Sequence, residues 1–108
     1  MVLSVFMLSQ QQTNGSATYY GKAYHGNKTA SGERFNMYDL TCAASSKYKF
    51  GTKLEVTNIA NGKSVIVKVN DRGSAINGNK LDLSQRAFRE IANLKTGIVK
   101  ILIKVLEN

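Results

Sequence analysis

Two polar segments carry carboxylates in places where functional sites tend to lie. Glu33 lies in the loop-like run Thr29–Phe35 beside a glycine and an arginine, and Asp71 follows an apolar run that ends in Asn-Asp-Arg-Gly. Loops and strand ends hold a disproportionate share of binding and catalytic side chains. Spacing alone leaves simpler interpretations open: Asp71 could cap a turn or pair with Arg72, and Glu33 could be one more surface acid.

Residue counts exclude most other catalytic constellations. The chain has one cysteine, Cys42, and one histidine, His25. A disulfide within the chain, a thiolate zinc site and every multi-histidine metal site are therefore excluded, and no metal or cofactor is expected. Cys42 lies in an apolar run and is predicted to be a buried small hydrophobe. The segment from Gly73 to Lys80 lacks the Gly-Lys-Ser/Thr ending of a phosphate-binding loop.

Length and charge limit the function classes further. A chain of 108 residues with 43% hydrophobic and 20% charged residues is the size of one domain that can bury a core. A net charge of +8 favours polyanions, anionic lipid or an acidic polymer as partners. The lysines are scattered and are not interleaved with aromatics, so nucleic acid is not the expected partner. We expect a monomer.

The N-terminal residues are interpreted separately from the domain. The apolar run from Val2 to Leu8 is too short to span a membrane and lacks a basic flank. It could be the remnant of an export signal, vector-derived sequence, an alternative start or a strand added to a neighbour. Residues 10–16 are polar and contain glycine, as linkers do. We therefore predict an extension or linker over residues 1–16 and one domain over residues 17–108.

Hydrophobic alternation predicts a mainly β body. The runs Ala17–Tyr24, Leu54–Ile59, Val65–Val69 and Val99–Leu106 are typical of half-buried strands. Asn61-Gly62 favours a type I′ turn that pairs the second run with the third.

One amphipathic helix is predicted from Ser84, as N-cap, to about Asn93. Gly97 is placed to end it. Several short strands with one helix favour a small closed barrel, because closure removes exposed edges.

A family resemblance is carried by motifs that run in one order along the chain. From about Ala17 to Leu106 the sequence resembles the rare lipoprotein A (RlpA) family. The motifs are Tyr19-Tyr20-Gly21, His25-Gly26, Thr29-Ala30-Ser31-Gly32-Glu33-Arg34-Phe35, Leu40-Thr41, Phe50-Gly51, Val56-Thr57-Asn58, Asn61-Gly62-Lys63-Ser64, Val69-Asn70-Asp71-Arg72-Gly73 and Leu81-Asp82-Leu83-Ser84.

The resemblance implies a fold and a chemistry. It implies a six-stranded double-ψ β-barrel with one short α-helix, as in expansin and barwin domains. It also implies a peptidoglycan lytic transglycosylase that cleaves the MurNAc–GlcNAc bond of bacterial cell-wall glycan strands and forms a 1,6-anhydro product. Glu33 matches the catalytic acid and base, and Asp71 matches a second, supporting carboxylate. If the two acids share one pocket, like-charge repulsion should raise the pKa of Glu33, unless Arg72 or Arg34 opposes the shift by pairing with one acid.

The chain departs from the family pattern at one position. Relatives typically have Ala-Ala-His after Leu-Thr, whereas Ser45 stands at that place here. Enzyme activity is therefore left open, and a weak or inactive glycan-binding, expansin-like barrel or a protease inhibitor is the alternative. The resemblance implies a periplasmic, envelope or secreted location if an export signal exists. Candidate substrate-binding residues are Tyr20, His25, Ser45, Asn70 and Arg72; of the adjacent tyrosines, only one can face a given groove.

Overall fold

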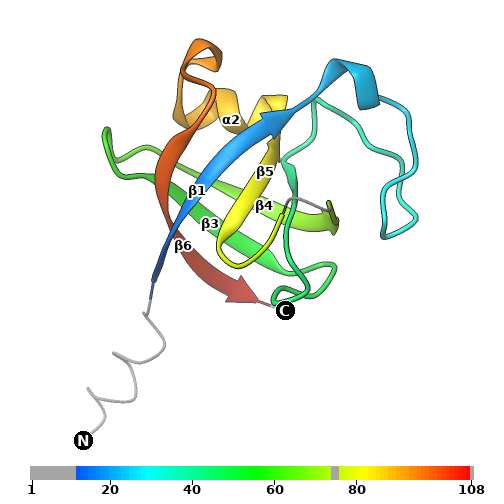
Figure 1. The fold of residues 1–108 in the computed structure, drawn as a ribbon, viewed down its shortest axis with the longest axis horizontal. Coiled ribbons are helices and arrows are strands. Elements are labelled where there is room, and N and C mark those ends of the chain that lie inside the picture. Colours follow the sequence, from blue (N-terminus) through cyan, green and yellow to red (C-terminus); the bar gives the residue numbers. More distant parts are fainter. Residues whose placement is uncertain (1–11, 74–75, 108) are drawn as a thin grey trace, which may run out of the picture.

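A closed six-stranded barrel forms the body of the domain. The computed structural model describes residues 12–73 and 76–107. Neighbouring strands follow the order β1-β5-β2-β4-β3-β6, with β1/β5 and β2/β4 parallel and the other pairs antiparallel. Within these residues, the predicted six-stranded barrel with one short α-helix is confirmed (Figure 1). The elements are β1 (Thr13–Tyr20), η1 (Lys22–Tyr24), β2 (Thr41–Ala43), β3 (Lys53–Asn58), β4 (Ser64–Asp71), β5 (Lys80–Ser84), α2 (Gln85–Ile91), η2 (Leu94–Thr96) and β6 (Val99–Glu107).

The barrel interior is filled by alternate residues of the strands. In β3 and β4 every second side chain from Leu54 and from Val65 is buried, as a period of two requires. The face of α2 that carries Phe88 and Ile91 packs against this core. Cys42 is completely buried, as predicted for a small hydrophobe, and burial raises the pKa of its thiol. Among the described residues no helix has the length and apolar character needed to cross a membrane.

The first strand begins earlier and ends earlier than its composition suggested. Composition assigned residues 13–16 to a linker, but they pair with β6 from Thr13 onwards. Gly15 is needed there because a Cβ at this position would lie 2.2 Å from the carbonyl oxygen of Asn79. The strand ends at Tyr20, and the 3-10 turn η1 follows where the strand was expected to continue to Tyr24. Residues 1–11 lie outside the described residues.

The predicted β3–β4 hairpin is confirmed, but its turn differs from the predicted type. Thr57 faces Ser64, so the connection is longer than a two-residue type I′ turn. In the described residues only glycines have positive φ, so Gly62 at +75° lacks the second left-handed residue that type I′ requires. Asn61 instead donates its side-chain amide to the carbonyl oxygen of Ile91. The turn is thus shaped by its contact with the end of α2.

The helix begins as predicted and stops sooner. Ser84 Oγ accepts a hydrogen bond from the backbone N–H of Ala87 at 3.1 Å, the expected N-cap contact. The helix ends at Ile91 because Ala92 has an extended conformation. Gly97, at φ +75°, ends the following 3-10 turn η2 and not α2 itself.

Candidate functional site

Two surface hollows lie at the end of β4. The tyrosine hollow is lined by Tyr20, Tyr24, Ala43, Asp71, Arg72, Gly73, Ile76 and Asp82. The Glu33 hollow is lined by Ser31, Glu33, Phe50, Gly51, Lys68, Val69 and Asn70. Asn70 and Asp71 are consecutive residues of one strand, and successive strand residues point to opposite sides. The end of β4 therefore supplies Lys68 and Asn70 to the Glu33 hollow and Asp71 to the tyrosine hollow.

A tight turn presents Glu33. The backbone N–H and the hydroxyl of Thr29 both donate to the carbonyl oxygen of Glu33, each at 2.7 Å. Gly32 donates its N–H back to the carbonyl of Thr29 at 3.0 Å and has a φ of +94°, which favours glycine. The Thr-Ala-Ser-Gly-Glu run is thus a closed local structure that holds Glu33 at its end.

This turn is bound to the end of β4. The N–H of Ser31 donates to the carbonyl of Asn70 at 3.2 Å, and the N–H of Ala30 donates to Asp71 Oδ1 at 2.9 Å. The side-chain amide of Asn70 donates to Glu33 Oε1 at 3.1 Å. The loop after Gly32 therefore meets the end of β4, as the pairing of the two acids requires.

Glu33 is paired with a lysine. Lys68 Nζ lies 2.8 Å from Glu33 Oε2, and the side chains are 41% and 48% exposed. The hydrogen bonds from Lys68, first, and from Asn70 lower the pKa of Glu33. The expected rise of this pKa is wrong, because the Glu33 carboxylate faces a cation and an amide donor. Arg34, considered as a partner for one of the acids, instead donates to the carbonyl of Gly26 at 3.0 Å.

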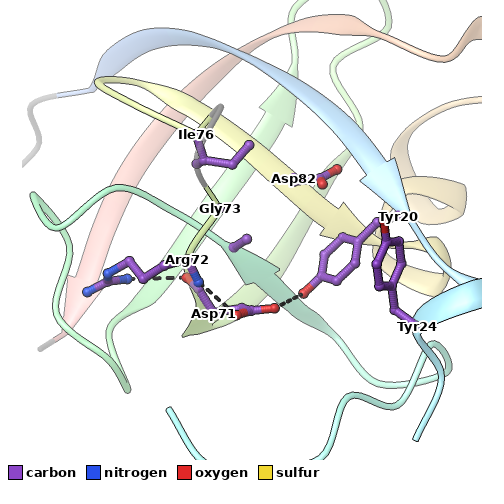
Figure 2. A pocket seen from close by; sticks show the side chains of 8 residues that line it. Tyr20, Tyr24, Asp71, Arg72, Gly73, Ile76 and Asp82 are labelled. Carbon is purple, nitrogen blue, oxygen red and sulfur yellow. Dashed lines mark hydrogen bonds between the residues drawn. The ribbon is translucent and has the colours of Figure 1, made fainter. Parts of the chain in front are cut away.

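Asp71 is held by hydrogen bonds from three segments. Besides Ala30, the N–H of Arg72 donates to its Oδ1 at 2.8 Å. The Tyr20 hydroxyl donates to its Oδ2 at 3.3 Å, a contact visible in Figure 2. Burial and, next, the Asp71 charge raise the pKa of Tyr20, so this phenol stays protonated. Asp71 is thus fixed by neutral donors.

Arg72 donates hydrogen bonds from its guanidinium to backbone carbonyls and not to the carboxylates. Its guanidinium donates to the carbonyl of Tyr48 at 2.8 Å and of Ala44 at 3.2 Å. The same group lies 4.1 Å from the centroid of the Phe50 ring, a cation–π distance. Arg72 therefore ties the β2–β3 connection to the end of β4.

The adjacent tyrosines point to different sides of β1, as alternation requires. Tyr19 packs on Phe88 with ring centroids 4.8 Å apart, and its hydroxyl donates to the carbonyl of Leu94. Tyr20 lines the tyrosine hollow and stacks on Phe35 at 4.5 Å. Tyr20 is therefore the one of the pair that faces the site.

Two candidate substrate-binding residues line neither hollow. His25 is exposed, and its Nδ1 accepts the N–H of Met37 at 3.2 Å. Ser45 donates its hydroxyl to the carbonyl of Gly78 at 3.1 Å and accepts the N–H of Lys47. Both make local contacts that fix loops. The structure therefore brings together Glu33, Asp71, Tyr20, Asn70 and Arg72, but not these two residues.

Sequence reasoning missed a third carboxylate at the site. Asp82 lines the tyrosine hollow (Figure 2). Thr18 Oγ1 donates to its Oδ1 at 2.9 Å. Burial, with a further contribution from Asp71, raises the pKa of Asp82. Its neighbours Leu81 and Leu83 are fully buried, so the strand pattern already placed Asp82 on the other face of β5.

Comparisons with known proteins agree with this architecture. The profile of a family described as lytic transglycolase matches residues 12–103. A probable endolytic peptidoglycan transglycosylase RlpA of Aquifex aeolicus is 47% identical over 92 residues, which cover 85% of the chain and 40% of the relative. The endolytic peptidoglycan transglycosylase RlpA of Vibrio cholerae is 40% identical over 86% of the chain and 35% of the relative. The chain thus spans less than half the length of these curated relatives.

Solved structures show the same barrel. A Streptomyces papain inhibitor superposes with a TM-score of 0.76 at 26% identity, over 90% of this chain and 96% of the inhibitor. An expansin mutant of Clavibacter michiganensis in complex with cellohexaose superposes with a TM-score of 0.74 at 28% identity, over 90% of this chain and 51% of the expansin. The architecture is therefore the double-ψ β-barrel that the motifs implied.

Proposed function

Because this chain belongs to the lytic transglycolase family and its RlpA-like branch, we propose that it binds peptidoglycan glycan strands and cleaves the MurNAc–GlcNAc glycosidic bond. The observation that carries this proposal is the contact between the turn that presents Glu33 and the end of β4, where Asp71 lies 38 residues further along the chain. The Asn70 amide holds Glu33, while the next residue, Asp71, holds the turn that presents it. Two carboxylates, one in each of the two hollows at the end of β4, suit glycosidic-bond cleavage.

The proposed reaction uses Glu33 twice. In its protonated form Glu33 donates to the leaving glycosidic oxygen as the bond to the muramyl anomeric carbon breaks. The carboxylate then accepts the proton of the muramyl 6-hydroxyl, whose oxygen attacks the anomeric carbon and closes the 1,6-anhydro ring. Asp71 stabilises the positive charge that develops on the sugar. Asn70 positions Glu33, and Arg72 supports the β2–β3 connection beside Asp71. Tyr20 lies in the wall of the tyrosine hollow.

Lys68 sets a condition on this reaction. A carboxyl group whose pKa is lowered is ionised at neutral pH and must gain a proton before it can act as an acid. Both partners of the ion pair are about half exposed, so the pair is weak enough to open when substrate binds. We infer that Lys68 restrains the acid form of Glu33 in the free protein.

Replacing Lys68 by methionine is expected to move the activity profile toward higher pH. Loss of the ammonium group raises the pKa of Glu33, so its acid form persists to higher pH and the basic limb of the profile shifts upward. The expected result is the direction of this shift, with activity at the basic end of the range rising relative to wild type. Product release measured from pH 4 to 8 checks this, with Lys63→Met, a lysine that lines neither hollow, as matched control. An unmoved profile would show that Lys68 does not tune Glu33.

The alternative proposal is glycan binding without cleavage. The observation in its favour is that Ser45, where relatives typically have histidine, contacts the Gly78 carbonyl and lines neither hollow. A protease-inhibiting barrel is a further alternative, suggested by the papain inhibitor of similar fold. Incubation with papain tests it, and unchanged papain activity would exclude it for that protease.

Binding to purified sacculi tests the shared part of these proposals. We expect the protein to sediment with sacculi at low salt, because a net charge of +8 attracts an anionic wall. Retention should fall as ionic strength rises from about 0.05 M to about 0.5 M, where the screening length becomes short. A cell-envelope location accords with this substrate. No sedimentation even at low salt would contradict glycan binding.

A further inference from the structure

Phe50 is an exposed aromatic residue that does not belong to the hydrophobic core. It lines the Glu33 hollow with 43% of its surface exposed, next to the Glu33–Lys68 ion pair. The guanidinium of Arg72 lies 4.1 Å from the ring centroid and is itself anchored to two backbone carbonyls. The ring is thus backed by a fixed planar group and still presents apolar surface to solvent.

A second exposed ring lines the other hollow. Tyr24 is 54% exposed and packs edge-on against Tyr20 with ring centroids 5.8 Å apart. Figure 2 shows Tyr24 and the Arg72 guanidinium on opposite sides of Asp71. Because Phe50 packs on that guanidinium, the two exposed rings flank Asp71 from two sides.

We propose that Phe50 and Tyr24 are the stacking platforms of two sugar subsites, one on each side of the bond that is cleaved. The proposal rests on the function proposed above and adds the residues that grip the strand. A pyranose ring presents a face of C–H groups, and an aromatic ring offers a matching apolar face of low conformational entropy. The sugar hydroxyls at the edges are left to the polar side chains between the rings, Glu33, Asn70 and Asp71.

The absence of tryptophan from the sequence allows a direct test at Phe50. Phe50→Trp keeps a platform and installs a single indole fluorophore. In a Glu33→Gln background, which prevents turnover, we expect saturable blue-shifted emission when soluble peptidoglycan glycan strands are added. Ile59→Trp, on the β3–β4 turn at the other end of β4, is the matched control and should not respond.

Removal of either ring should weaken binding. Phe50→Leu and Tyr24→Leu are each expected to raise the Kd for the same strands about 10-fold, whereas Phe50→Tyr should restore it to within about 3-fold. Tyr38→Leu removes an exposed ring that lines neither hollow and should leave the Kd unchanged. Melting temperatures identify any variant that is merely unfolded.

The outcomes separate this proposal from the proposed function. If the parent protein binds strands but the two leucine variants bind equally well, or the indole at position 50 does not respond, the stacking subsites are wrong and the function stands. If the parent protein binds neither soluble strands nor sacculi, the proposed function itself fails.

Discussion

Glu33→Gln is expected to abolish release of 1,6-anhydro-muramyl products from glycan strands. General acid–base catalysis contributes about 10²- to 10⁴-fold, and the amide can neither donate the acid proton nor accept the proton of the 6-hydroxyl. The isosteric side chain can still accept from Asn70 through its carbonyl oxygen, so the turn that presents position 33 should keep its geometry. Mass spectrometry of digests is the measurement, with binding to sacculi retained.

The control for Glu33→Gln is the same substitution at a carboxylate outside both hollows. Glu55→Gln changes a carboxylate on β3 that lines neither hollow, and it should leave product release unchanged. If Glu33→Gln still releases the products that wild type releases, another residue must act as the acid. Asp82 would be the first residue to test, because its pKa is raised. A wild type that releases nothing would favour the binding-only alternative, with Ser45 in place of the family histidine as its leading explanation.

The barrel could be predicted from local pattern wherever one periodicity dominates. Val65, Val67 and Val69 lie on one face of β4 and are all buried, whereas Ile66 and Lys68 between them lie on the other face. Prediction failed where a distant contact decided the conformation. Gly15 lies in a segment with the composition of a linker, but it is part of β1. Glycine is needed there because the carbonyl of Asn79, 64 residues away in sequence, leaves no room for a Cβ. Likewise, the side chain of Asn61 donates to the carbonyl of Ile91 at the end of α2, and the turn does not adopt type I′ geometry.

The candidate site could be predicted as a set of motifs but not as a spatial arrangement. Glu33 and Asp71 were identified from the family motifs, and the structure brings their loops into contact. The pKa of Glu33 was predicted to rise, whereas its contacts lower it. Its closest partner, Lys68, is an unremarkable strand lysine in the sequence and reaches Glu33 only because the turn folds onto β4. Asp82 was overlooked because it lies inside a strand, and pairing of that strand with β1 and β2 brings it to the hollow.

Asp71→Asn is expected to lower product release by about 10²-fold, the typical loss when one charge-stabilising group is removed from a site. The amide oxygen can still accept from Ala30 and Arg72, so the turn should remain docked and the melting temperature close to wild type. Asp71→Ala removes both contacts and should also cost about 1 kcal/mol of stability. A full rate in Asp71→Asn would rule out a supporting charge at this position.

The same substitution reports on the third carboxylate. The charge of Asp71 contributes to the raised pKa of Asp82, after burial as the main cause. Removing that charge should therefore lower the pKa of Asp82, and ¹³C NMR of its carboxyl group over a pH titration measures the change. Tyr20→Phe is the matched control, because it removes the hydroxyl that donates to Asp71 and leaves both charges in place. If Asp71→Asn leaves the Asp82 titration where it was, the two carboxylates do not act on each other in the tyrosine hollow. A downward shift would instead mean that any acid role of Asp82 depends on the carboxylate at position 71, so the effects of substituting the two residues on activity would not be additive.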